Sequence, residues 1–397
     1  MQKRIWNPAF ISVCLIAAFM NLGKQMSNSI LSKYVDSLGS PATIVGLVSS
    51  VFAFSALLFK LISGPALDTY DKEKIVIGAT FALGVAFLGY SFSTTVTIII
   101  VFRFLQGAAQ AFTATALLTM AADALPKEQF STGVGTFALF ETIATAIGPT
   151  IGLGLVRIIG YNSTFLVSSV FMFVSAIGVC FFKQKPFHQT KKFHISLDTI
   201  LAKESVKYAI LLFVFNFSFC VIGTYLAIYA EKQGVVENIG LYFTVYACAL
   251  LITRPFIGKL TDKLGVTKVL IPAFICFCIA YWLISISTTL WMFLSAAIIN
   301  AFGLGACQPV VQALCMKCVS QERRGAASST CYIANDLGNL VGAPVAGWIV
   351  ETFGYTAMWR AMTIPVIVAG IFVFCIRDRI KQTEKTFVTT AKLPNTF

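Results

Sequence analysis

The chain has 397 residues, of which 57% are hydrophobic and 12% are charged, and its formal net charge is +13. Together with a mean hydropathy of +0.81, this composition excludes a soluble globular fold and indicates an integral membrane protein. A high positive charge also occurs in nucleic-acid-binding proteins, but the positions of the basic residues argue against that class.

Twelve apolar runs are long enough to cross a bilayer as helices. About 20 residues span the hydrocarbon core, where every backbone polar group must be bonded within the helix. In chain order, the predicted spans are 9–32, 43–66, 74–93, 95–122, 131–156, 163–182, 207–230, 238–258, 268–287, 289–316, 326–350 and 355–376. The predicted fold class is therefore an all-α membrane protein with twelve transmembrane helices.

The Lys and Arg residues alternate between loops as expected for a multi-pass protein. If the N-terminus is cytoplasmic, the outside loops hold only Lys33, Arg157, Lys232 and Arg360, and most other basic residues fall on the inside. Basic residues accumulate on the cytoplasmic side of membrane proteins. We therefore predict a plasma-membrane protein with both termini cytoplasmic and with no nucleic-acid partner.

One long polar segment divides the spans into six and six. We predict an N-terminal six-helix bundle (1–182), a cytoplasmic linker (183–206), a C-terminal six-helix bundle (207–379) and a cytoplasmic tail (380–397). The linker is rich in Lys and contains a short amphipathic run, which suits a helix on the inner membrane surface.

The two halves repeat one another. Glu141 is followed by Gly148 and Pro149, and 195 residues after Glu141 comes Asp336, followed at the same spacing by Pro344. Proline removes a helix hydrogen bond, so we predict helix bends at these positions. Equivalent bends in two halves suit the rocking of one bundle against the other.

A second repeat follows the second and eighth spans, where a cation, a glycine and an aspartate recur at the same spacing in what we expect to be tight cytoplasmic turns. The glycine allows close helix contact, and the aspartate is placed to face a neighbouring helix N-terminus. The candidate gating residues are Gly64, Asp68, Arg254, Gly258, Asp262 and Gly265.

These motifs resemble those of the major facilitator superfamily. Residues 258–265, and more weakly 64–74, are similar to its loop signature, and residues 103–107 are similar to its second signature. Residues 144–152 resemble a fifth-helix signature of family members that export a drug or metabolite in exchange for protons. The resemblance implies two pseudo-symmetric six-helix bundles around a central cavity, with the first, fourth, seventh and tenth helices lining the substrate path.

Polar side chains form stripes on these same helices. At helical spacing, such residues share one face, and lipid does not accept that face. The predicted cavity residues are Asn21, Lys24, Gln25, Asn28, Arg103, Gln106, Gln110, Asn216, Tyr225, Asn300, Gln308 and Gln312. The alternative role for them is interhelical hydrogen bonding.

Glu141 and Asp336 are the acids near mid-span, where a charge costs roughly 2.5–3.5 kcal/mol. An apolar environment favours a protonated carboxyl, so we interpret both as proton carriers, with Lys24 or Arg103 as a partner of Glu141. Glu141 is the preferred coupling acid because cations are available in its own half. The alternative is a static ion pair. Lys60 and Arg254 lie near cytoplasmic ends, where extension of the side chain to the interface is sufficient explanation.

The sequence therefore predicts a secondary transporter that exports a small organic molecule by alternating access, with the proton gradient as its energy source. The alternative is a proton symporter or uniporter that imports an organic anion; a membrane enzyme or channel is disfavoured. The chain contains no nucleotide-binding motif and no clustered metal ligands, so we expect no cofactor and no metal. The expected partners are the substrate, protons and the lipid bilayer, and the expected state is a monomer.

Overall fold

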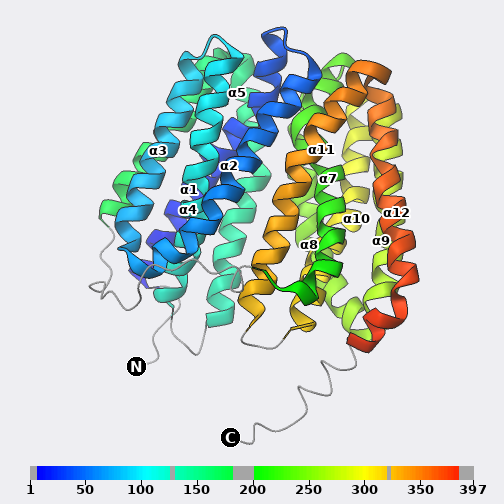
Figure 1. Ribbon diagram of the computed structural model, residues 1–397. Helices are drawn as coiled ribbons and strands as arrows, with labels where there is room; N and C mark the ends of the chain where they lie inside the picture. The colour runs from blue at the N-terminus through cyan, green and yellow to red at the C-terminus, as the bar shows by residue number, and fades with distance from the viewer. Residues whose placement is uncertain (1–6, 126–129, 182–200, 320–322, 384–397) are drawn as a thin grey trace, which may run out of the picture.

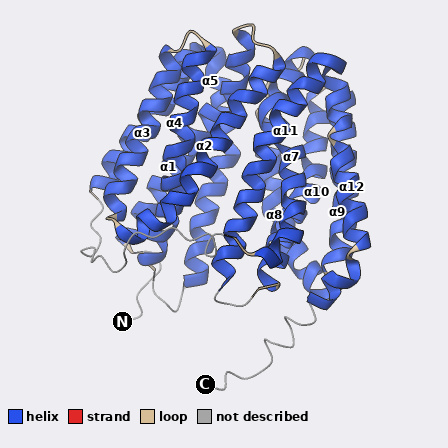
Figure 2. Ribbon diagram, viewed as in Figure 1, coloured by secondary structure: helices blue, strands red, loops and turns tan. Residues whose placement is uncertain are grey.

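A computed structural model describes residues 7–125, 130–181, 201–319 and 323–383 (Figure 1). The first half forms α1 (Pro8–Ser37), α2 (Ala42–Thr69), α3 (Lys72–Phe92), α4 (Val96–Asp123) and α5 (Phe130–Cys180). The second half forms α7 (Lys203–Lys232), α8 (Leu241–Leu264), α9 (Val266–Ile286), α10 (Leu290–Lys317), α11 (Arg324–Ala361) and α12 (Thr363–Cys375). These described residues include no strand (Figure 2).

Ten of the described helices are long and apolar enough to cross a membrane, and not the twelve predicted. Two of these candidate spans, Thr136–Cys180 and Ala326–Cys375, contain 45 and 50 residues, more than twice the roughly 20 needed for one crossing. Each is interrupted by a glycine with a positive φ, at 76° for Gly160 and 83° for Gly354. Both glycines lie between spans that the sequence predicts as separate, so twelve crossings stay a prediction.

The helices pack as two bundles side by side (Figure 1). Within the first bundle α1 packs on α5, and within the second α7 packs on α11, which are the equivalent pairs of the two halves. Glycines permit this close approach. A Cβ on Gly152 would lie 2.7 Å from the Met26 carbonyl oxygen, and one on Gly338 would lie 2.5 Å from that of Phe213. The bundles meet where α2 packs on α11 and α5 packs on α8.

The prediction that the candidate gating residues lie in tight turns is wrong for most of them. Gly64 and Asp68 lie within α2, and Gly258 and Asp262 lie within α8, because both helices run beyond the apolar part of their sequences. Helical backbone bonding continues after the membrane-spanning residues end, so hydropathy alone places the helix ends too early. Gly265 alone lies in the connection, with a φ of 84°.

Pro149 and Pro344 lie inside α5 and α11, where the backbone keeps helical angles. The departures from helical geometry occur instead at Gly160 and Gly354, so bends at the two prolines stay a prediction. Gly148 packs closely on α1, since a Cβ there would lie 2.6 Å from the Cβ of Gln25.

Most of the predicted linker and tail lies outside the described residues. The end of the predicted linker belongs to the second bundle, because α7 begins at Lys203. The amide of Ala202 donates to the Thr330 hydroxyl at 2.9 Å, and the buried Ala202 packs against Ala326 and Ala327. These contacts hold Ala202 against α11.

Candidate functional site

The two bundles contact each other where α2 packs on α11 and α5 packs on α8, and two faces of the molecule serve to locate these contacts. We call one of them the distal face; there α1 ends at Ser37 and α2 begins at Ala42 (top of Figure 1). The opposite face, where α1 begins at Pro8 and α12 ends at Cys375, is the terminal face. The surface along which α2 meets α11 and α5 meets α8 is called the seam.

Hydrogen bonds close the seam near the distal face. The Tyr225 hydroxyl lies 2.9 Å from the carbonyl oxygens of Ala42 and Ala343, which belong to different halves. On the α5–α8 side, the hydroxyls of Thr150 and Thr244 are 2.8 Å apart. Tyr225 is fully buried, so in this conformation it holds the halves together and does not line an open cavity as predicted.

Ion pairs at the rim join the halves further. Lys33 lies 2.7 Å from Glu231, and Arg157 lies 3.6 Å from Glu237. The backbone amide of Thr43 donates to the Glu351 carboxylate at 2.8 Å. Ion pairs with at least one solvent-exposed partner, as here, contribute little, and fully exposed ones only about 0–1 kcal/mol each. The rim therefore adds less to closure than the buried contacts below it.

Close glycine packing makes the seam sensitive to side-chain volume. A Cβ on Gly46 would collide with the backbone of Ala343 and lie 2.6 Å from the Tyr225 hydroxyl oxygen. We expect Gly46→Leu to disfavour distal closure by about 1–3 kcal/mol, because an overpacked contact forces the backbones apart. The measurement introduces Ser50→Cys as a reporter and labels it with a membrane-impermeant thiol reagent. Adding Gly46→Leu to this reporter protein should increase the labelling at least about fivefold.

The control is Gly154→Leu, since a Cβ on Gly154 meets no other atom within 4 Å. Equal labelling in the Gly46 and Gly154 variants would show that the seam does not depend on this contact.

Lys60 and Asp336 form an ion pair across the seam. Lys60 Nζ donates to Asp336 Oδ2 at 2.6 Å, and Lys60 Nζ also lies 5.6 Å from the centroid of the Tyr332 ring. Lys60 and Asp336 each lie eighteen residues from the distal ends of their helices, at Ala42 and Gly354, or about 27 Å along the helix axis. The pair therefore joins the halves well below the distal rim.

The interpretation that Lys60 only extends to the interface is wrong. The position of Lys60 near the end of its predicted span is compatible with that role. Its partner, however, is Asp336, which lies 276 residues away in the sequence. The signal available in the sequence was one cation and one acid at similar depth in different halves, neither with an assigned partner.

Glu141 and Lys24 lie near one another, but they do not form the predicted ion pair. They interact electrostatically, yet no Lys24–Glu141 contact within 4 Å occurs among the described residues. Asn21 holds α1 to α5 beside them, donating to the Glu141 carbonyl oxygen at 2.8 Å and to the Thr145 hydroxyl at 2.9 Å. Glu141, Lys24 and the neighbouring Gln25 are half-buried. The charged ends of Lys24 and Glu141 are therefore not engaged in an ion pair with each other.

Arg103 bonds to amides and not to Glu141, which corrects the second predicted pairing. Its Nη1 donates to Asn28 Oδ1 at 2.9 Å and to Gln106 Oε1 at 2.7 Å, and its guanidinium lies 4.6 Å from the centroid of the Phe52 ring. The Tyr90 hydroxyl donates to the same Gln106 oxygen at 2.7 Å. Arg103 is only 8% exposed and Gln106 is fully buried. In this conformation these residues form an interhelical network, which was the alternative reading of the stripe.

We expect Gln106→Leu to lower the stability of the protein by about 1–3 kcal/mol, because it removes the acceptor shared by Arg103 and Tyr90 in a buried position. The measurement is thermal unfolding of the purified protein in detergent. Gln106→Glu is the matched control, since it keeps the acceptor and supplies a counter-charge to Arg103. If the Leu variant unfolded at the same temperature as the Glu variant, the network would not contribute to stability.

Two of the predicted cavity residues in the second half, Asn216 and Asn300, bond to neighbouring helices. Asn216 Nδ2 donates to Asn335 Oδ1 at 2.7 Å, which ties α7 to α11. Asn300 is fully buried and lies 3.4 Å from the Tyr242 hydroxyl. The predicted residues Gln110, Gln308 and Gln312 are half-buried. Partly exposed polar groups thus occur on α4, α7 and α10, as well as on α1.

Only part of the predicted gating set can be placed. The side chains of Asp68 and Asp262 and the surroundings of Gly64 and Gly258 lie outside the described residues, and Arg254 is exposed. Within the described part of the chain, no three His, Cys, Asp or Glu side chains gather as a metal site would require.

Two apolar helical bundles joined by a seam with charged residues in its depth define the class of a multi-pass membrane transporter. The model of the Major Facilitator Superfamily matches residues 13–237 and 208–396. The chain belongs to this superfamily.

Several curated proteins are similar along most of their length. The multi-drug resistance efflux pump PmrA of Streptococcus pneumoniae is 29% identical over 381 residues, with 91% of each chain covered. The staphylopine export protein of Staphylococcus aureus is 24% identical, with 88% of this chain and 92% of that protein covered. The multidrug resistance protein MdtG of Enterobacter lignolyticus is 23% identical, with 86% and 85% covered.

Solved structures share the fold at low sequence identity. The nucleoside transporter NupG has a TM-score of 0.79 at 13% identity, covering 93% of this chain and 99% of that one. A bacterial homologue of the human lysosomal transporter Spinster, in an inward-facing and unoccupied conformation, has a TM-score of 0.77 at 13% identity, covering 96% and 99%. At these identities the likeness establishes the two-bundle fold and nothing finer.

Proposed function

We propose that the chain exports a small organic molecule across the plasma membrane in exchange for protons, by alternating access. The proposal draws on the names of its relatives, which include a multi-drug efflux pump and a staphylopine exporter. It also draws on Glu141, a half-buried acid that no described cation approaches within ion-pairing distance. Intramembrane acids of this kind commonly carry protons in transporters.

The observation that carries the proposal is the Lys60–Asp336 pair, which joins the two halves at 2.6 Å deep in the seam. In this proposal, opening of the distal face separates the halves along the seam and breaks this pair. In the proposed cycle, the conformation closed at the distal face loads substrate from the terminal face. Separation of Lys60 from Asp336 then exposes the binding region to the distal face, where Glu141 takes up a proton.

In this proposal the terminal face is cytoplasmic, as the positions of the basic residues favour, and the described conformation is the inward-facing one. Loading from the cytoplasm and release at the distal face amount to export.

A second candidate is the import of an organic anion, by proton symport or by uniport. Lys24 favours it, since this half-buried cation makes no ion pair within 4 Å with the described residues and is free to meet a carboxylate or phosphate. The same cation would repel an organic cation. The two candidates therefore differ in the charge of the substrate as well as in direction.

The test uses inside-out and right-side-out vesicles with an imposed pH gradient. The probes are ethidium, an organic cation, and carboxyfluorescein, an organic anion. Export by proton exchange predicts uptake of a probe into acid-loaded inside-out vesicles, abolished by a protonophore. Carboxyfluorescein uptake into right-side-out vesicles alone would replace the proposal by the import reading, and transport insensitive to the gradient would refute proton coupling.

A further inference from the structure

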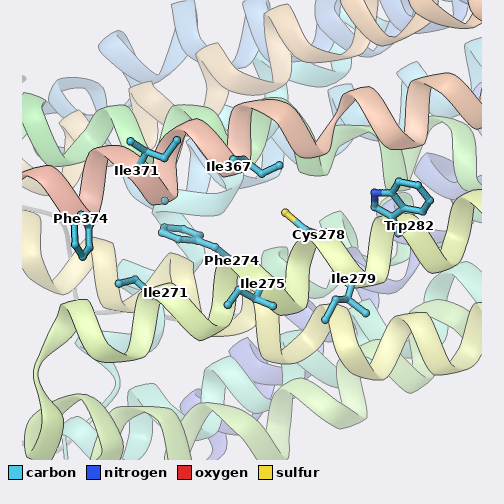
Figure 3. Close-up of a pocket in the computed structure, with 10 residues that line it drawn as sticks. Ile271, Phe274, Ile275, Cys278, Ile279, Trp282, Ile367, Ile371 and Phe374 are labelled. Carbon is cyan, nitrogen blue, oxygen red and sulfur yellow. The ribbon is translucent and has the colours of Figure 1, made fainter.

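A groove lies between α9 and α12 on the outer surface of the second bundle, away from the seam. Its volume is about 560 Å³, within the roughly 300–1,000 Å³ typical of ligand pockets. Its walls are apolar and include Ile275, Cys278 and Ile279 on α9 and Ile367 and Ile371 on α12. Figure 3 shows the side chains of both helices along this groove, with Phe374 toward one end and Trp282 at the other. The Cys278 thiol and the Trp282 indole are the polar groups among its lining residues, and the rest of the lining is hydrocarbon.

The length of the groove matches one leaflet of a bilayer. Ile271 and Trp282 line its two ends and are eleven residues apart on α9, which corresponds to about 16 Å. Half of the roughly 30 Å hydrocarbon core is about 15 Å. An extended acyl chain running along the helices fits this dimension.

Cations lie where the groove reaches the terminal face. Lys268 is exposed, precedes Ile271 by three residues, and so continues the face of α9 that lines the groove. On the other wall, the Arg377 guanidinium carbon lies 4.5 Å from the centroid of the Phe374 ring, which itself lines the groove. The two basic groups thus flank the end of the groove at the membrane interface.

The local acid does not cancel this charge. Asp378 Oδ1 lies 4.0 Å from Arg377 and 3.8 Å from Lys381, so one carboxylate is shared by two cations. Lys268 forms no ion pair within the described part of the chain. The group of Lys268, Arg377, Lys381 and Asp378 is therefore net positive.

The opposite end is less suited to a headgroup. Arg360 is the cation there, but its guanidinium carbon lies 4.7 Å from the centroid of the Trp282 ring, and its Nε donates to the Ser285 hydroxyl at 3.3 Å. The Arg360 guanidinium is thus already engaged. Charge complementarity thus favours a ligand whose head lies at the terminal face.

We propose that the α9–α12 groove binds one anionic phospholipid, with an acyl chain in the groove and the headgroup phosphate between Lys268 and Arg377. Juxtamembrane cations attract anionic lipids by about 1 kcal/mol each. The groove lies away from the seam and so is separate from the residues assigned to the transport cycle above.

The probes are phosphatidylglycerol and phosphatidylcholine of the same acyl chains, titrated onto the delipidated full chain in detergent and counted by native mass spectrometry. We expect one tightly retained phosphatidylglycerol. The double variant Lys268→Gln with Arg377→Gln should weaken its binding about 30-fold, or about fivefold for each cation removed. Cys278→Phe, which places a ring in the groove, should displace the chain and abolish retention. Lys263→Gln and Cys248→Phe, at exposed positions on α8, are the matched controls.

Equal retention of both lipids, or undiminished binding in the charge variant, would overturn the anionic headgroup site. Retention of phosphatidylglycerol by a folded Cys278→Phe variant would overturn the groove as the acyl-chain site. A dimer in the wild type that Cys278→Phe dissociates would show that a second copy of the chain covers this surface, which would also overturn the proposal. The charge variants lie on the surface and keep the test valid if the groove variant fails to fold.

Discussion

Replacing Asp336 with Asn is expected to release the distal closure and to slow transport about 30-fold. The substitution leaves Lys60 without its partner at 2.6 Å, in a position where its side chain is 32% exposed and that of Asp336 only 14% exposed. Breaking a fully buried pair costs about 3–5 kcal/mol. Because Lys60 retains some access to water, we expect about 2 kcal/mol, which corresponds to a roughly 30-fold shift away from the closed state. The measurements are the transport rate and the thermal unfolding temperature.

The matched control is the charge-swapped double variant, Lys60→Asp with Asp336→Lys. It restores an attractive pair across the seam, so it should regain much of the stability and transport lost in the single variants. If Asp336→Asn transported at the wild-type rate, or if the swapped variant were no better than either single variant, the pair would not be part of the closure.

Glu141→Gln is expected to abolish gradient-driven accumulation while leaving substrate exchange intact. Gln cannot carry a proton, but it has the same shape, and the bonds from Asn21 go to the Glu141 backbone carbonyl and to Thr145, so the packing of α1 on α5 is kept. If one proton is exchanged per substrate, each unit of pH difference supports about tenfold accumulation of substrate by the wild type. The Glu141→Gln variant should show no such accumulation. Counterflow between labelled and unlabelled substrate measures the exchange that remains.

Glu351→Gln serves as the control for this substitution. Glu351 accepts a hydrogen bond from the Thr43 amide at the rim, and a glutamine oxygen accepts the same bond, so coupling should be unaffected. Full gradient-driven accumulation by Glu141→Gln would show that the proton is carried elsewhere, with Asp336 as the next candidate.

The sequence predicted the fold well because hydropathy and helix-breaking residues act locally. Gly160 and Gly354 fall between predicted spans, and the positive φ that each adopts favours glycine. The stripes on the first and fourth spans predicted cavity residues, and in this conformation Asn28, Arg103 and Gln106 hydrogen-bond to one another, which is the alternative role.

Pairing across long sequence distances was the part that the sequence did not predict. A helical repeat indicates which residues share a face, but not which helix that face meets. Arg103 was expected beside Glu141, yet amides on α1 and α4 take up its hydrogen bonds. Lys60 was left without a role, although the second bundle supplies its partner. In both cases the packing of whole helices decides the partner, and a single sequence gives no record of that packing.

Closure of the seam is tested most directly by measuring distances between pairs of spin labels, one pair across each face of the protein, in lipid nanodiscs. Spin labels at Leu38 and Val236 report the distal face, and labels at Tyr70 and Leu264 report the terminal face; all four side chains are exposed. The wild type should show a short distal distance and a long terminal one. Asp336→Asn should add a population in which the distal distance is long and the terminal one short, and the charge-swapped variant should remove it. An unchanged distal distance in Asp336→Asn, or lengthening at both faces together, would contradict closure of the seam by the Lys60–Asp336 pair.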